Sequence, residues 1–297
     1  MTEKTSVFSK ATFFLSLVLT AERKNMNSFM SWVGGKKNLR DEVLARFPPY
    51  YERYIEVFGG AGWVLFHKPP GMDFEVYNDF NSNLANLYRC VRDKPNRLKY
   101  KLRYVLNSRE DFDLTSSLHK RGIFEKLCDA DRASKFYQLI RYSYASGLDS
   151  FGSQPHSMWS DFPMIDLAAR RLQKVVVENK DFEKLIKQYD RPVSFFYCDP
   201  PYFATENYYK DVGFTAKDHI RLRDALLDIK GRFLVSYNDC PEIREIWHKP
   251  NIHIEEISRL NNLAQRYDGG CQYAELLISN YDTSERAKAI KQLSLFD

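Results

Sequence analysis

The stretch Glu56-Val57-Phe58-Gly59-Gly60-Ala61-Gly62 runs from strand-forming residues into a cluster of glycines. Glycines at the end of a strand let the backbone turn tightly and approach a ligand closely, as at the first βα turn of nucleotide-binding folds. A tight turn without a ligand uses the same residues. Asn78-Asp79 follows the next apolar run and places a carboxylate where ribose hydroxyls could donate to it. Together, the two stretches favour a domain that binds an adenosine-bearing cofactor.

Short apolar runs alternate with amphipathic helical stretches along most of the chain. This alternation is expected of a parallel sheet with helices on its faces. The predicted strands are residues 54–58, 74–77, 175–177, 194–198, 233–236, 252–257 and 274–279. We therefore predict an α/β fold with one seven-stranded sheet.

The alternation stops between residues 91 and about 163, where the sequence becomes basic, aromatic and helical. The clearest predicted helices span residues 89–104 and 132–144. A loop rich in Gly, Ser and Pro is expected at 145–159, and the last residues, 291–297, are expected to form a frayed tail. The pattern predicts a helical domain inserted into the α/β fold.

Charge supports this division of the chain. The formal net charge is only +5, but from Lys94 to Arg141 there are twelve Lys or Arg against six Asp or Glu, so the positive charge lies in the insert. The predicted units are an N-terminal extension at 1–25, a catalytic domain made of 26–92 and 164–297, and an inserted domain at 93–163.

Composition sets the class of protein. A hydrophobic content of 44% and an aromatic content of 15% suffice for a full core and exclude a disordered chain. The cysteines are odd in number and lack metal-binding spacing, which excludes a disulfide scaffold and favours reduced thiols in the cytoplasm. They are Cys90, Cys128, Cys198, Cys240 and Cys271.

The first residues weakly resemble a signal peptide, since Lys4 and Lys10 precede an apolar run at 11–19. That run is too short to span a bilayer. We expect an unstructured extension instead, with Met26 or Met30 as the functional start.

The stretch Phe195-Phe196-Tyr197-Cys198-Asp199-Pro200-Pro201-Tyr202 is a buried-strand pattern that ends in an acid, two prolines and an aromatic residue. The carboxyl end of such a strand is where open α/β sheets bind ligands. The prolines stiffen the turn and fix the aromatic ring. Asp199 and the carbonyl of Pro200 could accept the two hydrogens of a planar amine, while Tyr202 stacks on its ring. The alternative is a proline-stiffened turn with a capping Asp.

In their order, these motifs resemble the Dam-type, class D12, alpha-group site-specific DNA adenine N6-methyltransferases. The resemblance rests on Trp32-Val33-Gly34-Gly35-Lys36, the glycine turn, Asn78-Asp79-Phe80-Asn81, the basic insert and Asp199 to Tyr202. Residues 178–182 and 274–281 are similar to two further elements of the family. The resemblance implies a Rossmann-like, seven-stranded S-adenosylmethionine-dependent methyltransferase sheet with an inserted helical DNA-recognition domain.

The resemblance also implies roles for individual residues. Asp199, Pro200 and Tyr202 would be catalytic, with Asp199 also bordering the cofactor. Trp32 and Lys36 would contact the methionine end of S-adenosylmethionine. The remaining cofactor contacts would be Phe58, Gly59 and Gly60 as a cradle, Asp79 at the ribose, and Asp181 with Phe182 at the adenine.

The insert would bind double-stranded DNA, mostly through phosphates and partly through a recognition loop. The expected phosphate contacts are Lys99, Lys101, Arg103, Arg109, Lys120 and Arg121. The expected groove or wedge contacts are Arg141, Tyr144, Ser150, Phe151 and Ser153. The target sequence stays open, because the loop departs from that of the enzymes that act on GATC.

Other interpretations stay open. Cytosine N4-methylation uses related chemistry, although Asp rather than Ser at position 199 favours adenine. Methylation of RNA or of a protein glutamine is disfavoured, because those sites typically place Asn there. A non-catalytic DNA-binding protein could keep the same fold, but the intact Asp199 to Tyr202 motif argues against it. The histidines lack ligand spacing, so we expect no metal, and we expect a monomer without an obligatory protein partner or membrane.

Overall fold

The computed structural model describes residues 26–32, 34–71, 73–203, 213–260 and 272–293. The predicted extension at 1–25 lies outside the described residues. Among the described residues, every helix is too short or too polar to cross a membrane.

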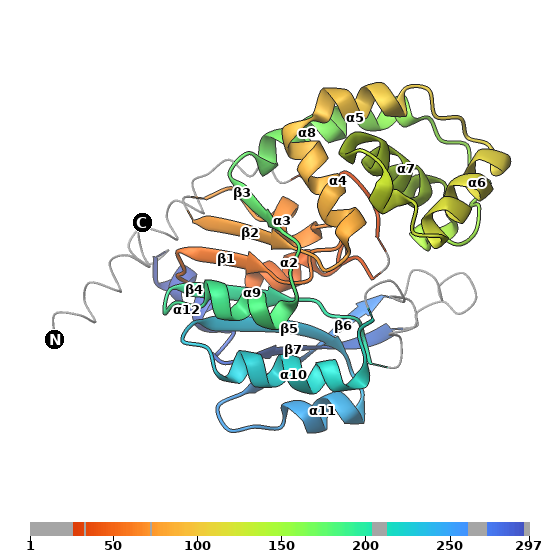
Figure 1. Cartoon of the computed structure of the whole chain (residues 1–297). Helices are drawn as coiled ribbons and strands as arrows, with labels where there is room; N and C mark the ends of the chain where they lie inside the picture. The colour runs from red at the N-terminus through yellow and green to blue at the C-terminus, as the bar shows by residue number, and fades with distance from the viewer. Residues whose placement is uncertain (1–25, 33, 72, 204–212, 261–271, 294–297) are drawn as a thin grey trace.

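One seven-stranded sheet forms the centre of the molecule (Figure 1). Its strands are β1 (Arg53–Glu56), β2 (Phe74–Asn78), β3 (Val175–Glu178), β4 (Ser194–Cys198), β5 (Arg232–Asn238), β6 (His253–Leu260) and β7 (Gln272–Ser279). The order across the sheet is β3-β2-β1-β4-β5-β7-β6. Strand β7 pairs antiparallel with β5 and β6, and the other adjacent pairs are parallel. The predicted α/β class and all seven predicted strands are confirmed.

The order of the strands determines where a ligand can bind. The chain reverses its direction of progress across the sheet at β1, which lies between β2 and β4. Open α/β sheets bind ligands at such a switch point, beyond the carboxyl ends of the strands. The glycine turn directly follows β1 and Asp199 directly follows β4, so both predicted motifs lie at this edge.

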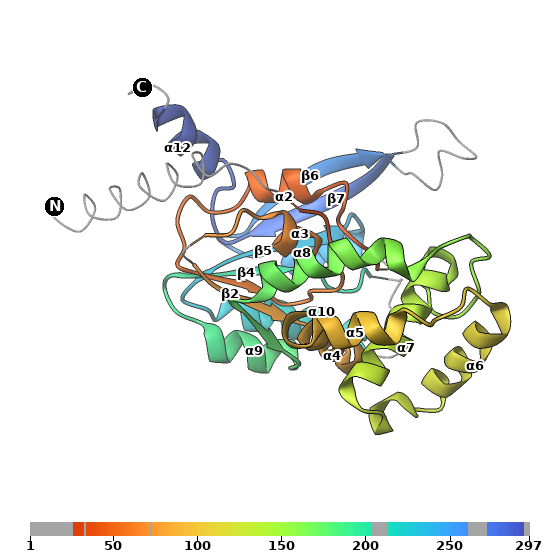
Figure 2. The ribbon, with the colours of Figure 1, turned by 90° about the horizontal axis from the view of Figure 1, so that it is seen from above.

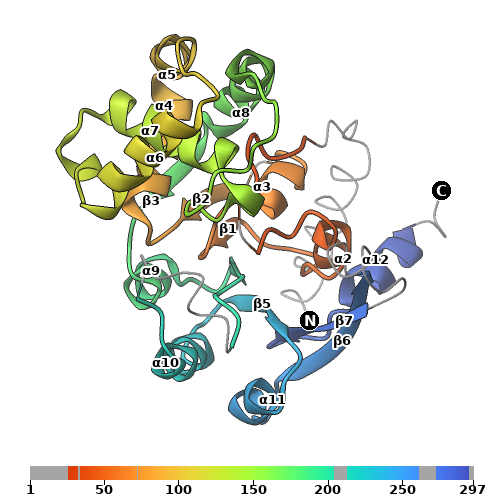
Figure 3. The ribbon, with the colours of Figure 1, turned by 90° about the vertical axis from the view of Figure 1, so that its right-hand side faces the viewer.

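Helices cover both faces of the sheet (Figure 3). One face carries α9 (Phe182–Tyr189), α10 (Ala216–Leu227) and α11 (Pro241–Trp247), and the other carries α2 (Arg40–Ala45) and α3 (Trp63–His67). Their apolar side chains pack against the strands and form two buried clusters, one on each face. Helix α12 (Glu285–Leu293) includes residues 291–293, so the first part of the expected frayed tail is helical instead.

Five helices lie between β2 and β3 in the sequence, and Figure 2 shows α5, α6 and α7 gathered far from α12. They are α4 (Ser82–Asp93), α5 (Pro95–Leu102), α6 (Arg109–Lys120), α7 (Asp129–Tyr142) and α8 (Phe162–Leu172). Short 3₁₀ turns are η1 (Phe124–Lys126), η2 (Tyr144–Ser146) and η3 (Met158–Asp161). Both α4 and α8 also contact β3, so the domain limits at 93 and 163 stay predictions.

The predicted single helix at 89–104 is wrong. The chain forms two helices, α4 and α5, because Lys94 leaves the helical conformation with φ −135° and ψ 39°. Pro95 follows, and proline lacks the amide hydrogen that a continuous helix requires. Helix α4 also begins earlier than predicted, because the Asn81 side chain accepts hydrogen bonds from the amides of Asn83 and Leu84. The predicted helix at 132–144 corresponds to α7, which begins three residues earlier than predicted, at Asp129.

Candidate active site

Asp199 lies at the carboxyl end of β4 and is held by two side chains from distant parts of the sequence. The Lys36 ammonium donates to Asp199 Oδ1 at 2.5 Å, and the Ser236 hydroxyl donates to the same oxygen at 3.2 Å. Among the described residues, no hydrogen bond ends on Oδ2 of Asp199. One carboxylate oxygen is therefore fixed by the protein, while the other can accept a hydrogen from a ligand.

Lys36 also contacts the predicted stacking residue. Its ammonium donates to the Tyr202 hydroxyl at 2.5 Å and lies 4.4 Å from the centroid of that ring. The Lys36 side chain is 3% exposed. Burial by itself would lower the pKa of Lys36, but the carboxylates of Asp199 and Glu275 outweigh burial and raise that pKa. Lys36 therefore stays cationic at neutral pH and links Asp199 to Tyr202.

The pKa of Asp199 reflects two opposing effects. Burial raises it, whereas the charge of Lys36 and the hydrogen bond from Lys36 lower it, and the net pKa lies above the ordinary value. Two consecutive prolines then lead from Asp199 to Tyr202 and restrict the backbone of the turn. The result is a desolvated acceptor next to a positioned aromatic ring, which suits a flat amine.

The glycine turn after β1 contacts the acid after β2. Gly60 has φ +50°, which favours glycine, and a Cβ atom there would come within 3.2 Å of the Trp32 ring. The Gly60 amide donates to Asp79 Oδ2 at 2.9 Å, and the Asn81 amide donates to Asp79 Oδ1 at 2.8 Å. Burial raises the pKa of Asp79 to about 6, partly offset by these two amides. The structure thus brings Trp32, Gly60 and Asp79 together.

Aromatic rings form the adjacent wall. The centroids of Phe58 and Phe182 are 5.6 Å apart, and Phe214 lies within 6.0 Å of both. Asp181 caps the start of α9 by accepting from the amides of residues 183 and 184, and it forms an ion pair with Arg221. The Arg221 guanidinium lies 4.2 Å from the Phe182 centroid. Asp181 therefore has structural partners already, and its predicted contact with adenine would share the carboxylate with Arg221.

Several of the predicted DNA contacts form ion pairs with acids of the insert or of helix α8. The pairs are Lys99–Asp166 at 2.5 Å, Lys101–Asp131 at 2.8 Å, Lys120–Asp149 at 3.5 Å and Arg141–Asp161 at 2.9 Å. Arg103 and Arg109 instead lie over the rings of Trp159 and Phe151. Arg121 is exposed at the end of α6. The lysines are therefore less available to phosphates than their charge alone suggests.

The predicted recognition loop folds back on itself. The Tyr144 amide donates to the Ser150 carbonyl at 2.7 Å, and Arg109 donates to Ser153 Oγ at 3.1 Å. Phe151 packs against Phe112, while the Tyr144 side chain is 62% exposed. Within this loop, four non-glycine residues have positive φ: Ala145, Ser146, Leu148 and Ser153. Such a backbone is costly for L-residues, so the loop holds a specific shape that presents Tyr144 to solvent.

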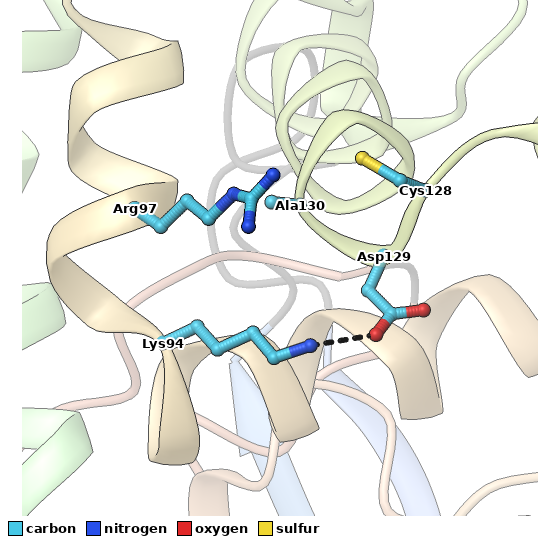
Figure 4. Close-up of a pocket in the computed structure, with 5 residues that line it drawn as sticks. All are labelled: Lys94, Arg97, Cys128, Asp129 and Ala130. Atoms are coloured by element: carbon cyan, nitrogen blue, oxygen red, sulfur yellow. Dashed lines mark hydrogen bonds and ion pairs between the residues drawn. The ribbon is translucent and has the colours of Figure 1, made fainter.

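A surface pocket lies elsewhere, between the starts of α5 and α7 (Figure 4). Its volume is about 150 Å³, and it is lined by Lys94, Arg97, Cys128, Asp129 and Ala130. Lys94 and Asp129 point toward each other across it and form an ion pair at 2.8 Å. Pockets for cofactors usually have volumes of ~300 Å³ or more. We therefore do not assign a cofactor to this pocket.

Sequence reasoning missed several residues at the carboxyl edge. Ser236 ends a predicted strand but belongs to no motif, and Phe214 and Arg221 reach the aromatic wall only because α10 packs against α9. Glu275 lies in a segment identified only as a strand. A polar residue at the end of a predicted strand, such as Ser236, is a weak sequence signal for a site. Phe214, Arg221 and Glu275 reach the site only through tertiary contacts, which the sequence pattern does not show.

Comparison with known proteins identifies the family of the chain. Residues 32–262 match the family model described as D12 class N6 adenine-specific DNA methyltransferase. The Type II methyltransferase M1.LlaDCHI of Lactococcus lactis subsp. cremoris is 30% identical over 287 residues, covering 89% of this chain and 99% of the relative. The DNA adenine methylase of Escherichia coli strain K12 is 28% identical, covering 80% of this chain and 89% of the relative. The DNA adenine methylase of Haemophilus influenzae is 27% identical, covering 74% of this chain and 82% of the relative. The chain belongs to the D12 class of N6 adenine-specific DNA methyltransferases.

Proposed function

We propose that this enzyme transfers a methyl group from S-adenosylmethionine to N6 of an adenine that is flipped out of double-stranded DNA. The observation that carries the proposal is the arrangement of Asp199, whose Oδ1 is held by Lys36 and Ser236 at the carboxyl end of β4. Oδ2 and the Pro200 carbonyl would accept the two amino hydrogens, and Tyr202 would stack on the base.

The residues at the switch point fit S-adenosylmethionine. The backbone at Gly60 approaches closely because it has no side chain, and Asp79 offers buried carboxylate oxygens suited to ribose hydroxyls. Phe58 and Phe182 provide apolar faces suited to an adenine ring. When bound, the cofactor supplies an electrophilic methyl group on a sulfonium. The predicted contacts of Trp32 and Lys36 with its methionine end remain part of this proposal.

The chemistry that Asp199 supports follows from the amine. The lone pair on N6 of adenine is delocalised into the ring, which makes the atom a poor nucleophile. Hydrogen bonds to Asp199 Oδ2 and the Pro200 carbonyl would pull the hydrogens out of the ring plane and restore the lone pair. Positioning of this kind can supply roughly 7–11 kcal/mol of the barrier. The charged Asp199 would also stabilise the positive charge that develops on N6, and the methylated amine would then lose one of its two protons to water.

The target amine is not accessible inside a duplex, so the base has to leave the stack. Stacking on Tyr202 would contribute about 1–3 kcal/mol toward holding it. The inserted helices would bind the surrounding duplex, with Arg103, Arg109 and Arg121 as phosphate contacts and Tyr144 in a groove. We further propose that the enzyme acts as a monomer in the cytoplasm, where its DNA substrate lies, without an obligatory partner.

Calorimetric titration with S-adenosylmethionine tests the cofactor part of this proposal. Wild type and Asp199→Asn should both bind it, because the amide preserves shape, whereas Phe182→Ala should bind about tenfold more weakly, having lost an aromatic face. In a single-turnover assay, Asp199→Asn should then transfer no methyl group. Absence of binding by the wild type, or wild-type transfer by Asp199→Asn, would overturn the proposal.

A further inference from the structure

Glu275 is a buried acid with no assigned role. It lies on β7 opposite Asn238 of β5 and Ile257 of β6, and its side chain is 1% exposed. An ionised carboxylate in the interior is costly unless a positive charge lies close to it. Glu275 Oε2 lies 4.0 Å from the Lys36 ammonium, the cation that also contacts Asp199.

The sheet places Glu275 on the same face as the groups that hold Asp199. Side chains alternate between the two faces of a strand, and Ser236 pairs with Leu277 while Asn238 pairs with Glu275. Ser236 and Glu275 therefore project to one side of the sheet at its carboxyl edge. Lys36 reaches this side from the N-terminal segment and contacts carboxylates that come from two different strands.

The Lys36 ammonium lies near two carboxylates. Lys36 is the cation, while Asp199 and Glu275 are the carboxylates that raise its pKa. Other titratable groups near the cluster include Tyr202, which accepts from Lys36, and also Glu56 and Tyr197. Burial raises the pKa of Glu56 to about 8 and raises the pKa of Tyr197 well above its ordinary value. Lys36 is thus held by two carboxylates that come from different parts of the sheet.

We propose that Glu275 is a positioning residue for methyl transfer, which holds the Lys36 ammonium so that Lys36 keeps Asp199 oriented toward the target amine. Glu275 itself does not touch the base. The inference rests on the proposed role of Asp199. Without Glu275, the Lys36 ammonium would lose one of the two carboxylates that fix its position.

The test compares three variants in the full-length enzyme. Glu275→Gln removes the charge and keeps the shape, and Glu275→Asp keeps the charge but retracts it by one methylene. The matched control is Glu256→Gln, which removes an exposed carboxylate from the neighbouring strand β6. For each we would measure Tm, kcat with unmethylated genomic DNA, and the pH profile of kcat/KM.

For Glu275→Gln, kcat should fall by about 10- to 100-fold, as expected when a reacting group is misplaced, while the control stays at the wild-type value. Glu275 raises the pKa of Asp199, so the acid limb of the profile should move to lower pH in Glu275→Gln. In Glu275→Asp, kcat should fall less, and the acid limb should stay in place. A purely structural role would lower Tm without moving the limb.

A double-mutant cycle tests the route through Lys36. If Glu275 acts by holding Lys36, then Lys36→Met with Glu275→Gln should be no slower than Lys36→Met alone. Additive losses would overturn the inference, as would wild-type kcat and pH profile in Glu275→Gln. If Glu275→Gln does not fold, wild-type kcat in Glu275→Asp would overturn it. Activity in Asp199→Asn would instead refute the proposed function, so the two failures are distinguishable.

Discussion

At the scale of single residues, the site contains more ionisable groups than its chemistry uses directly. Glu56 ends β1 beneath the glycine turn, is 2% exposed and accepts a hydrogen bond from the Tyr54 hydroxyl at 2.7 Å. Asp79 ends the neighbouring strand region and is bound by two backbone amides. Burial dominates the pKa of both, so both titrate closer to neutrality than ordinary carboxyls do.

Glu56 should make stability depend on pH. Its pKa is about 8 in the folded protein, against about 4.3 in an unfolded chain. The folded state therefore binds the extra proton, and the free energy of unfolding falls as pH rises through this window. Glu56→Gln removes the titration, so its Tm relative to wild type should increase between about pH 5 and about pH 9. A Tm difference that is constant across this range would show that Glu56 is ionised throughout.

Asp79 should make cofactor affinity depend on pH. Its pKa is about 6, and only the ionised carboxylate accepts hydrogen bonds at both oxygens. Affinity for S-adenosylmethionine should therefore increase as pH rises through this value. Asp79→Asn should bind roughly 10- to 100-fold more weakly at neutral pH, the loss expected for a charge-assisted hydrogen bond, and should lack this pH dependence. Calorimetric titration of wild type and Asp79→Asn at several pH values measures this affinity. If Asp79→Asn showed the same pH dependence as wild type, the titrating group would be one other than Asp79.

At the scale of elements, the βα turn after β1 tolerates little change. A Cβ atom on Gly59 would overlap the ring of Tyr77 on β2, which lies against the turn. Tyr77 cannot withdraw easily, because it is buried, stacks on Tyr88 and donates to the Gly60 carbonyl at 2.7 Å. The turn is thus fixed by packing from the neighbouring strand as well as by its own conformation.

We therefore expect Gly59→Ala to lower stability by about 1–3 kcal/mol through overpacking, and to weaken cofactor binding because the turn is displaced. Gly122→Ala is the control. Gly122 has φ +65°, yet the nearest atom to a Cβ there is 3.7 Å away, so only the conformational cost applies. Chemical denaturation measures the stability of Gly59→Ala and Gly122→Ala, and calorimetry measures their affinity for the cofactor. Unchanged cofactor affinity in Gly59→Ala would mean that the turn does not form the cradle.

The inserted helices allow a similar comparison for DNA. Arg121 is exposed, whereas Lys99 forms an ion pair with Asp166 at 2.5 Å. Arg121→Ala should weaken binding to all sequences alike and reduce the slope of log affinity against log salt by about 1. Lys99→Ala should change this slope less. Fluorescence anisotropy at several salt concentrations measures both. A larger change for Lys99 would show that DNA displaces Asp166 from its ion pair.

At the scale of the whole molecule, the sequence predicted the features that local patterns encode. Short apolar runs identified every strand, and the turn residues near Gly60 and Asp199 marked the carboxyl edge, because glycine permits tight turns and proline restricts the backbone. The break at Lys94 was missed even though Pro95 signals it. The ion pairs of Lys99 and the contacts of Glu275 join residues far apart in sequence, so no local pattern encodes them.

The architecture explains why the parts of the site come from so many segments. The switch point at β1 and β4 gathers the glycine turn, Asp79 and Asp199 at one edge, while the N-terminal segment supplies Lys36 and β7 supplies Glu275. The five helices between β2 and β3 then place a basic surface and the Tyr144 loop on the same chain. Binding of DNA, binding of a methyl donor and activation of the amine can therefore occur in one protein.

The most direct test is the fate of a tritiated methyl group. Wild type and Asp199→Ala are incubated with labelled S-adenosylmethionine and unmethylated genomic DNA, and the nucleosides are separated by chromatography. The account predicts label in N6-methyladenine with the wild type and none with Asp199→Ala. Label in N4-methylcytosine, or label in adenine that persists in Asp199→Ala, would contradict it.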